Sequence, residues 1–155
     1  MSMKNRMKIL ILLTICGFML AGYFLWAERR PVEIVNVHGT GNFSDILVKN
    51  FPITDRGKIN WWLKNKDALK RQYDIPKPAS YGNYTVSIWL FGEGYKEDDK
   101  YDRLCFSDMK PPMNCIEKDR VFIISYSKNS GITFTVDDGE YSLEDDGKIT
   151  KLESH

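Results

Sequence analysis

The chain has 155 residues, of which 43% are hydrophobic and 28% charged, and its formal net charge is +1. The small net charge excludes the strongly basic composition that is typical of nucleic-acid-binding proteins. After an apolar N-terminal segment, the rest of the chain has the length of one globular domain.

An uncharged apolar run covers residues 9–27, with Lys8 before it and Glu28-Arg29-Arg30 after it. As a helix, the run would be about 28 Å long, close to the hydrocarbon thickness of a bilayer, which is about 30 Å. In lipid only a helix satisfies all backbone groups of a single span. The sequence therefore predicts a transmembrane helix, with its interfacial residues at the outer end: Tyr23, Trp26, Arg29 and Arg30.

The charges on the two flanks predict the orientation of this helix. The tail of residues 1–8 carries Lys4, Arg6 and Lys8 and no acid, so we expect it to be cytoplasmic. Arg29 and Arg30, which Glu28 partly offsets, are a weaker signal in the opposite sense. We expect residues 31–155 to form a periplasmic domain, tethered to the inner membrane of a Gram-negative cell.

Two alternatives involve cleavage near this segment. A signal peptide has a shorter apolar stretch, about 7–15 residues, followed by a small-x-small site. Here the candidate site Met19-Leu20-Ala21 has no small residue at its first position, and the apolar run continues to Trp26. A lipoprotein site at Cys16 has Ile15 where a small residue is required. We therefore expect an uncleaved anchor.

Strand and helix patterns alternate beyond the anchor. Alternating β-branched residues predict a strand over residues 32–37, whereas residues 43–51 fit a strand or a short helix. Thr54 or Asp55 can cap a helix that ends near Tyr73. Its expected core-facing stripe is Ile59, Trp62, Leu63, Leu69 and Tyr73, and Lys66 falls within that stripe.

The C-terminal half has the pattern of strands joined by tight turns. We expect strands at residues 84–91, 102–106, 119–127, 132–136, 140–143 and 148–152. Asn-Ser-Gly and Asp-Gly sequences between them are typical of hairpins. The expected fold is α+β: an N-terminal transmembrane helix, followed by one helix packed on an antiparallel β-meander.

Cys105 and Cys115 are the cysteines outside the apolar run, and they enclose a loop that contains Pro111-Pro112. In an oxidising compartment such a pair favours a disulfide. Loop closure of this length contributes about 3 kcal/mol of stability. A metal site would need further ligands, and the two histidines, His38 and His155, are far away in the sequence.

Charge is uneven along the chain. Residues 54–78 hold seven bases and three acids, whereas residues 137–147 hold six acids and no base. These are either solvated faces or surfaces for a charged partner or lipid headgroups. On the helix, Trp61 lies off the apolar stripe beside Lys58 and Lys64. We take these three residues as candidates for partner binding, unless a neighbouring segment covers Trp61.

No motif in the sequence indicates catalysis. His38 follows the first expected strand and has no nucleophile motif near it. Asp138-Gly139 and Asp146-Gly147 lack the spacing of an EF-hand loop and fit hairpin turns. An acidic loop, Glu93 with residues 97–99, is a weak candidate for a hydrolytic carboxylate pair. We expect a non-enzymatic protein with no metal and no cofactor.

Several segments resemble a family of short enterobacterial membrane proteins, domain of unknown function 943. The resemblance is carried by residues 24–31, Gly41-Asn-Phe-Ser-Asp45, Asp55-Arg-Gly-Lys-Ile-Asn-Trp-Trp62, Ile75-Pro-Lys-Pro78 and Tyr101-Asp-Arg-Leu-Cys-Phe106. It implies the anchor and the cysteine pair, and it supplies no catalytic residues.

By analogy with small anchored periplasmic proteins, we expect a protein partner. The most concrete hypothesis is an immunity protein that blocks an envelope-acting antibacterial toxin. A structural or accessory subunit of an envelope complex is the alternative, and an envelope hydrolase is a third. The sequence predicts no oligomeric state.

Overall fold

The computed structural model describes residues 2–153. The chain divides into two compact units, and the boundary in the sequence lies between Pro31 and Val32. The first unit contains α1 (Met3–Arg29), a single helix of 27 residues. Its 25-residue stretch Met3–Ala27 is long and apolar enough to cross a membrane, a test that a signal sequence also passes. At about 1.5 Å per residue, this stretch is about 37 Å long, which is more than the ~30 Å hydrocarbon core.

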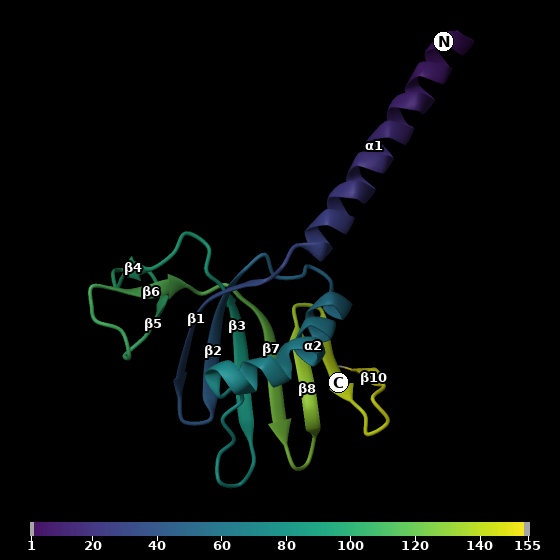
Figure 1. The fold of residues 1–155 in the computed structure, drawn as a ribbon. Coiled ribbons are helices and arrows are strands. Elements are labelled where there is room, and N and C mark those ends of the chain that lie inside the picture. The colour runs from purple at the N-terminus through teal and green to yellow at the C-terminus, as the bar shows by residue number, and fades with distance from the viewer. Residues whose placement is uncertain (1, 154–155) are drawn as a thin grey trace. The chain divides into compact units, whose positions relative to one another are not determined.

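The second unit is an α+β domain with one long helix and two sheets (Figure 1). The large sheet has seven strands in the order β1-β2-β3-β7-β8-β9-β10, and the small sheet has the order β4-β6-β5. The helix, α2, spans Asp55–Tyr73. The strands are β1 (Glu33–Thr40), β2 (Phe43–Lys49), β3 (Tyr84–Leu90), β4 (Lys96–Glu97), β5 (Arg103–Cys105), β6 (Met113–Glu117), β7 (Arg120–Ser127), β8 (Gly131–Val136), β9 (Gly139–Leu143) and β10 (Ile149–Leu152).

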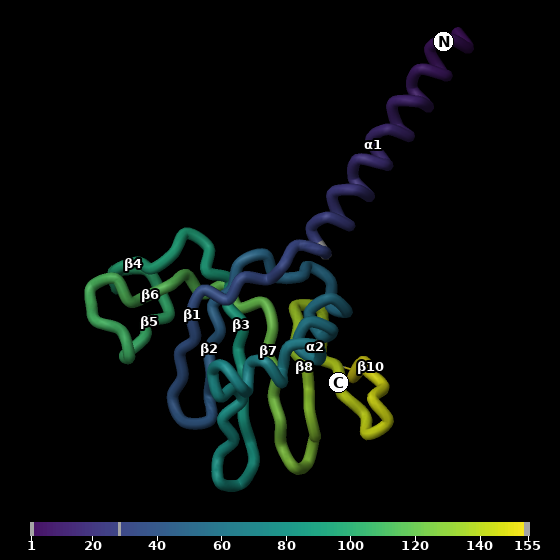
Figure 2. Tube along the Cα trace, viewed as in Figure 1, coloured from purple at the N-terminus to yellow at the C-terminus, as the bar shows by residue number. Residues whose placement is uncertain are grey.

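The α+β class is confirmed, but the large sheet is mixed and differs from the predicted antiparallel meander. β2 and β3 are parallel, with Ile46 opposite Ile88, and the other pairs in this sheet are antiparallel. The reason is α2, which connects the two strands along one face and returns the chain to the same end of the sheet. Figure 2 follows this connection, and along the chain the three strands of the small sheet come between β3 and β7, which are themselves neighbours in the large sheet.

The ends of α2 follow its sequence signals. The Thr54 hydroxyl accepts a hydrogen bond from the Gly57 amide at 3.0 Å, which confirms the predicted N-cap. At the other end Asp74 takes the left-handed conformation, with φ 55° and ψ 44°. Asp55 in the first turn and Lys70 and Arg71 in the last turn complement the helix dipole.

The main core lies between α2 and one face of the large sheet. Alternate strand residues such as Ile88, Ile124 and Phe134 are fully buried there against Trp62 and Leu69 of the helix. Of the predicted helical stripe, Ile59, Trp62 and Leu69 are buried, Leu63 is half-buried, and Tyr73 is 38% exposed.

A second core fixes the small sheet against the opposite face. Leu47 of β2 and Trp89 of β3 pack there with Phe106 and Ile116. Residues 43–51, which fitted either a strand or a helix, contain β2, because this segment is hydrogen-bonded on both sides, to β1 and to β3. The large sheet is therefore covered by α2 on one face and, around β2 and β3, by the small sheet on the other.

Candidate functional site

The three residues predicted to bind a partner lie in different environments on α2. Lys58 is 5% exposed, and its Nζ donates to the Val121 carbonyl at 3.1 Å. Trp61 is half-buried, and its ring meets Phe51 edge-on at 5.1 Å. Lys64 is exposed.

Lys58 is therefore not part of the accessible surface. It lies one turn before the buried Trp62, so both side chains project to the same side of the helix. The sequence placed Lys58 on the opposite face because periodicity locates a stripe without giving its full angular width. Lys66, which fell within the expected stripe, is exposed.

The solvent face of α2 is instead a polar row with helical spacing of three and four residues. All five of its side chains are exposed: Arg56, Asn60, Lys64, Asp67 and Arg71. We call these residues the α2 row. Three of them are cations and one is an acid, so the row attracts negatively charged groups.

The predicted interfacial residues lie together at the end of α1 and just after it. The rings of Tyr23 and Trp26 are exposed and have their centroids 6.2 Å apart. The Arg30 guanidinium lies 4.6 Å from the centre of the Trp26 ring, and Arg29 is exposed. Amphipathic aromatic rings beside cations are typical of the headgroup region of a bilayer.

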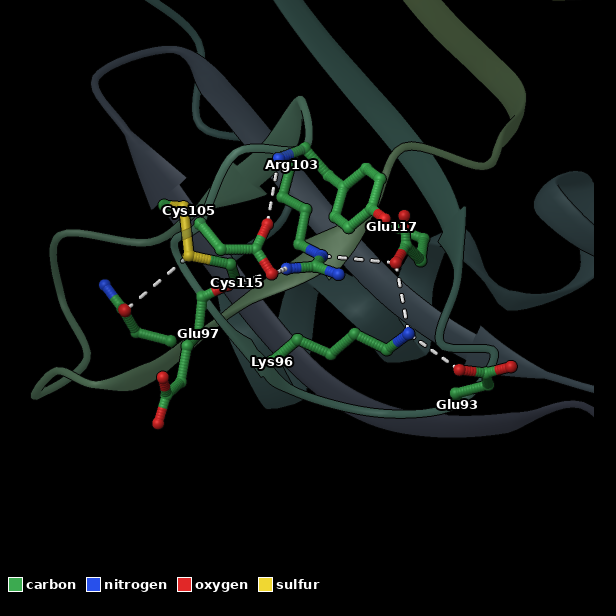
Figure 3. A network of polar contacts seen from close by, with 10 residues as sticks. Glu93, Lys96, Glu97, Arg103, Cys105, Cys115 and Glu117 are labelled. Atoms are coloured by element: carbon green, nitrogen blue, oxygen red, sulfur yellow. Dashed lines mark hydrogen bonds and ion pairs between the residues drawn. A yellow bond between two sulfur atoms is a disulfide. The ribbon is translucent and has the colours of Figure 1, made fainter.

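The small sheet is held together by a disulfide and by a network of charges (Figure 3). Cys105 and Cys115 lie directly opposite each other on β5 and β6 and form the predicted disulfide. Beside it, the Glu117 carboxylate accepts hydrogen bonds from Lys96 at 3.1 Å and from Arg103 at 3.2 Å. Arg103 also pairs with Asp99, and Lys96 with Glu93.

These contacts change the proton affinities of the small sheet. Hydrogen bonds from Lys96 and Arg103 lower the pKa of Glu117 below its ordinary value. The Arg103 side chain likewise lowers the pKa of Asp99. Asp98 lies close to both cysteine sulfurs, but the disulfide removes the thiolates that a metal ion would bind.

His38, which was expected to follow the first strand, lies within β1 and is buried. Its Nδ1 is 2.8 Å from both oxygens of Asp108, and its Nε2 is 3.0 Å from the Tyr95 hydroxyl. The ring stacks on Phe106 with 3.9 Å between centroids and is 4% exposed. The Asn36 amide donates to the same Tyr95 oxygen at 2.9 Å.

This His38 cluster connects β1 to the disulfide loop, because Asp108 lies between the two cysteines. Both nitrogens of His38 already have partners within the protein, and Phe106 covers one face of the ring. The arrangement therefore orients the loop against the sheet. The sequence gave no local signal for it, since His38 is 57 and 70 positions away from its two partners.

A neighbouring half-buried acid completes the polar part of this region. Asp45, opposite His38 on β2, accepts a hydrogen bond from the Trp89 indole at 2.7 Å. Burial raises the pKa of Asp45 above its ordinary value, although the Trp89 hydrogen bond and the nearby His38 and Arg120 oppose this shift. Trp89, a residue of the second core, is thus hydrogen-bonded to the residue that lies opposite His38 on the neighbouring strand.

Comparison with known families identifies the chain. Residues 3–153 match the family described as "Enterobacterial putative membrane protein (DUF943)". The match covers nearly the whole chain, so the protein belongs to this family of unknown function, as the resemblance predicted. Searches of curated proteins and of solved structures gave no match.

Proposed function

We propose that this protein is a single-pass inner-membrane protein whose periplasmic domain binds another protein. Three features support the orientation: the apolar helix α1, the basic tail before it, and a disulfide in the domain that follows. Disulfides persist in the periplasm and are rare in the bacterial cytosol. In this proposal residues 1–8 are cytoplasmic and the lipid bilayer holds α1.

The α2 row is the observation that carries the proposed protein contact. Its side chains face solvent, while the opposite side of the same helix is fixed against the sheet by Trp62 and Leu69. A helix held in this way presents Arg56, Lys64 and Arg71 in a fixed arrangement. We infer that the partner offers an acidic surface, with Trp61 at the margin of the contact.

The most concrete form of the proposal is an immunity protein that occludes an envelope-acting antibacterial toxin. Such a role needs binding and no catalytic chemistry, and the burial of the His38 ring, which is 4% exposed, agrees with this. An accessory subunit of an envelope complex is the other reading, and the same surface would serve it. Genetics separates the two, because immunity is needed only when the toxin is present.

Site-specific crosslinking tests the contact. A photoreactive residue at position 64 should capture one protein in living cells. The same residue at position 128, an exposed lysine of the β7–β8 turn, should not. Lys64→Glu should abolish the crosslink and any toxin protection, whereas Lys128→Glu makes the same charge change and should leave both intact. Equal behaviour at the two positions would contradict the proposal.

A further inference from the structure

The face of the large sheet opposite α2 carries a row of hydroxyl side chains. Across five neighbouring strands the directly paired residues are Thr85, Ser125, Thr133, Ser142 and Thr150. We call them the hydroxyl row. Neighbouring strands are about 4.8 Å apart, so the row extends for about 19 Å across the sheet.

Alternation along each strand fixes the side on which this row lies. Val86, Ile124 and Phe134 point into the main core beneath α2, so their neighbours Thr85, Ser125 and Thr133 point to the other face. The second core, which holds the small sheet, takes its residues from β2 and β3 and none from β8 or β9. Most of the row is therefore partly open to solvent, and Thr133 is the deepest, with 8% exposure.

Aromatic side chains lie at the β2 end of the row. Phe43 is paired with Thr85, so its ring continues the same line of residues, and it is 59% exposed. Tyr81, in the turn before β3, is 63% exposed. Both residues line a shallow cavity of about 370 Å³ together with Thr85, Ser125, Thr133 and Glu140.

The cavity carries less charge than the α2 row or the turns around β9. Among the described residues that line it, Glu140 alone is charged, and the others are hydroxyl, amide, aromatic or glycine residues. The α2 row, in contrast, is basic, and the turns around β9 are acidic. A ligand that matches the cavity is uncharged and carries many groups that both donate and accept hydrogen bonds.

We propose that this face binds a neutral glycan chain of β-1,4-linked pyranose units. Ser and Thr hydroxyls both donate and accept hydrogen bonds, as sugar hydroxyls do. Exposed aromatic rings offer the flat apolar surface on which the C–H face of a pyranose ring packs. The interstrand spacing of about 4.8 Å is close to the length of one sugar in an extended chain, so successive sugars meet successive strands.

This inference is independent of the protein contact on α2, which occupies the other side of the sheet. It also gives Glu140 a role, since a single carboxylate beside neutral groups accepts hydrogen bonds from two adjacent sugar hydroxyls. A neutral extended peptide is the competing ligand for such a surface, and the experiment below includes it.

Calorimetric titration of the full-length protein tests the inference. The protein is held in a detergent without a sugar headgroup, and the probe is the hexamer of β-1,4-linked N-acetylglucosamine. We expect saturable binding to the wild type. Phe43→Ala and Tyr81→Ala should each weaken it about tenfold, because each removes one stacking surface.

Thr133→Val keeps the side-chain shape and removes one hydroxyl, so it should weaken binding about three- to tenfold. Ser125→Ala gives the same test at a more exposed position, should Thr133→Val fail to fold. The matched control is Tyr101→Ala, which removes an aromatic ring of similar exposure, 57%, that does not line the cavity. Its binding should equal that of the wild type.

Three results would overturn the inference. The first is a wild-type protein that does not bind the hexamer at millimolar concentration. The second is equal weakening by Phe43→Ala and Tyr101→Ala. The third is tighter binding of a neutral six-residue peptide than of the hexamer at the same cavity.

Discussion

Cleavage of the Cys105–Cys115 disulfide should lower the stability of the domain by a calculable amount. The two cysteines are 10 positions apart, and closing a loop of this length removes about 2.7 kcal/mol of chain entropy from the unfolded state. With a urea dependence of about 2 kcal/mol per molar, the unfolding midpoint should fall by about 1.3 M.

The assay is urea unfolding of the full-length protein in detergent, followed by tryptophan fluorescence, with and without a reductant. Trp89 reports on the second core, which packs directly against the small sheet. The control is the double variant Cys105→Ala with Cys115→Ala, which keeps Cys16 and should not respond to the reductant. A wild-type midpoint that is the same in both conditions would mean that the disulfide does not restrain the unfolded loop.

Three further predictions can be checked by the same unfolding measurement. Trp62→Ala should cost about 3–5 kcal/mol because its ring is 1% exposed in the main core, whereas Asn60→Ala on the α2 row should change stability by less than about 0.5 kcal/mol. Lys58→Ala should cost about 1–3 kcal/mol because it leaves the partly buried Val121 carbonyl without this donor, and Lys64→Ala should be neutral. Acid should weaken the small sheet. Because folding lowers the pKa of Asp99 and of Glu117, both carboxylates stabilise the domain at pH values above their ordinary pKa values of 3.8 and 4.5. This stability is lost as the pH falls through the lowered pKa values. Glu117→Gln should reduce this loss of stability in acid. The same pH dependence of the unfolding free energy in the variant and the wild type would contradict this prediction.

Asp45 should have the opposite pH dependence. Its pKa is raised, so the folded state holds its proton more tightly than the unfolded chain does. Its contribution to stability is therefore greatest at pH values below its ordinary pKa of 3.8, and it is lost as the pH rises through the raised pKa of the folded state. Asp45→Asn should remove this component and leave the acid loss of the small sheet in place.

Local patterns predicted the elements of the fold better than their arrangement. The β-branched run from Tyr84 to Leu90 and the cap at Thr54 were readable because their causes lie within a few residues. The parallel pairing of β2 with β3 depends on the path of α2, and no short segment encodes that path. Hairpin signals alone therefore suggested a meander.

The candidate sites also differ in whether their residues are close together in the sequence. Cys105 and Cys115 were paired from their spacing, whereas the His38 cluster joins residues from distant parts of the chain. The hydroxyl row is also invisible to a linear pattern, because its five members become neighbours only through the strand register. Periodicity placed Trp61 beside Lys58, but packing on the sheet buried the lysine.

A reporter fusion determines on which side of the membrane the domain lies. A phosphatase that folds only in the periplasm is attached after residue 155, and both its activity and the N-terminus of the fusion are determined. We predict an active, membrane-bound enzyme that retains the residues of α1. An inactive fusion, or a soluble product that begins after Trp26, would contradict it.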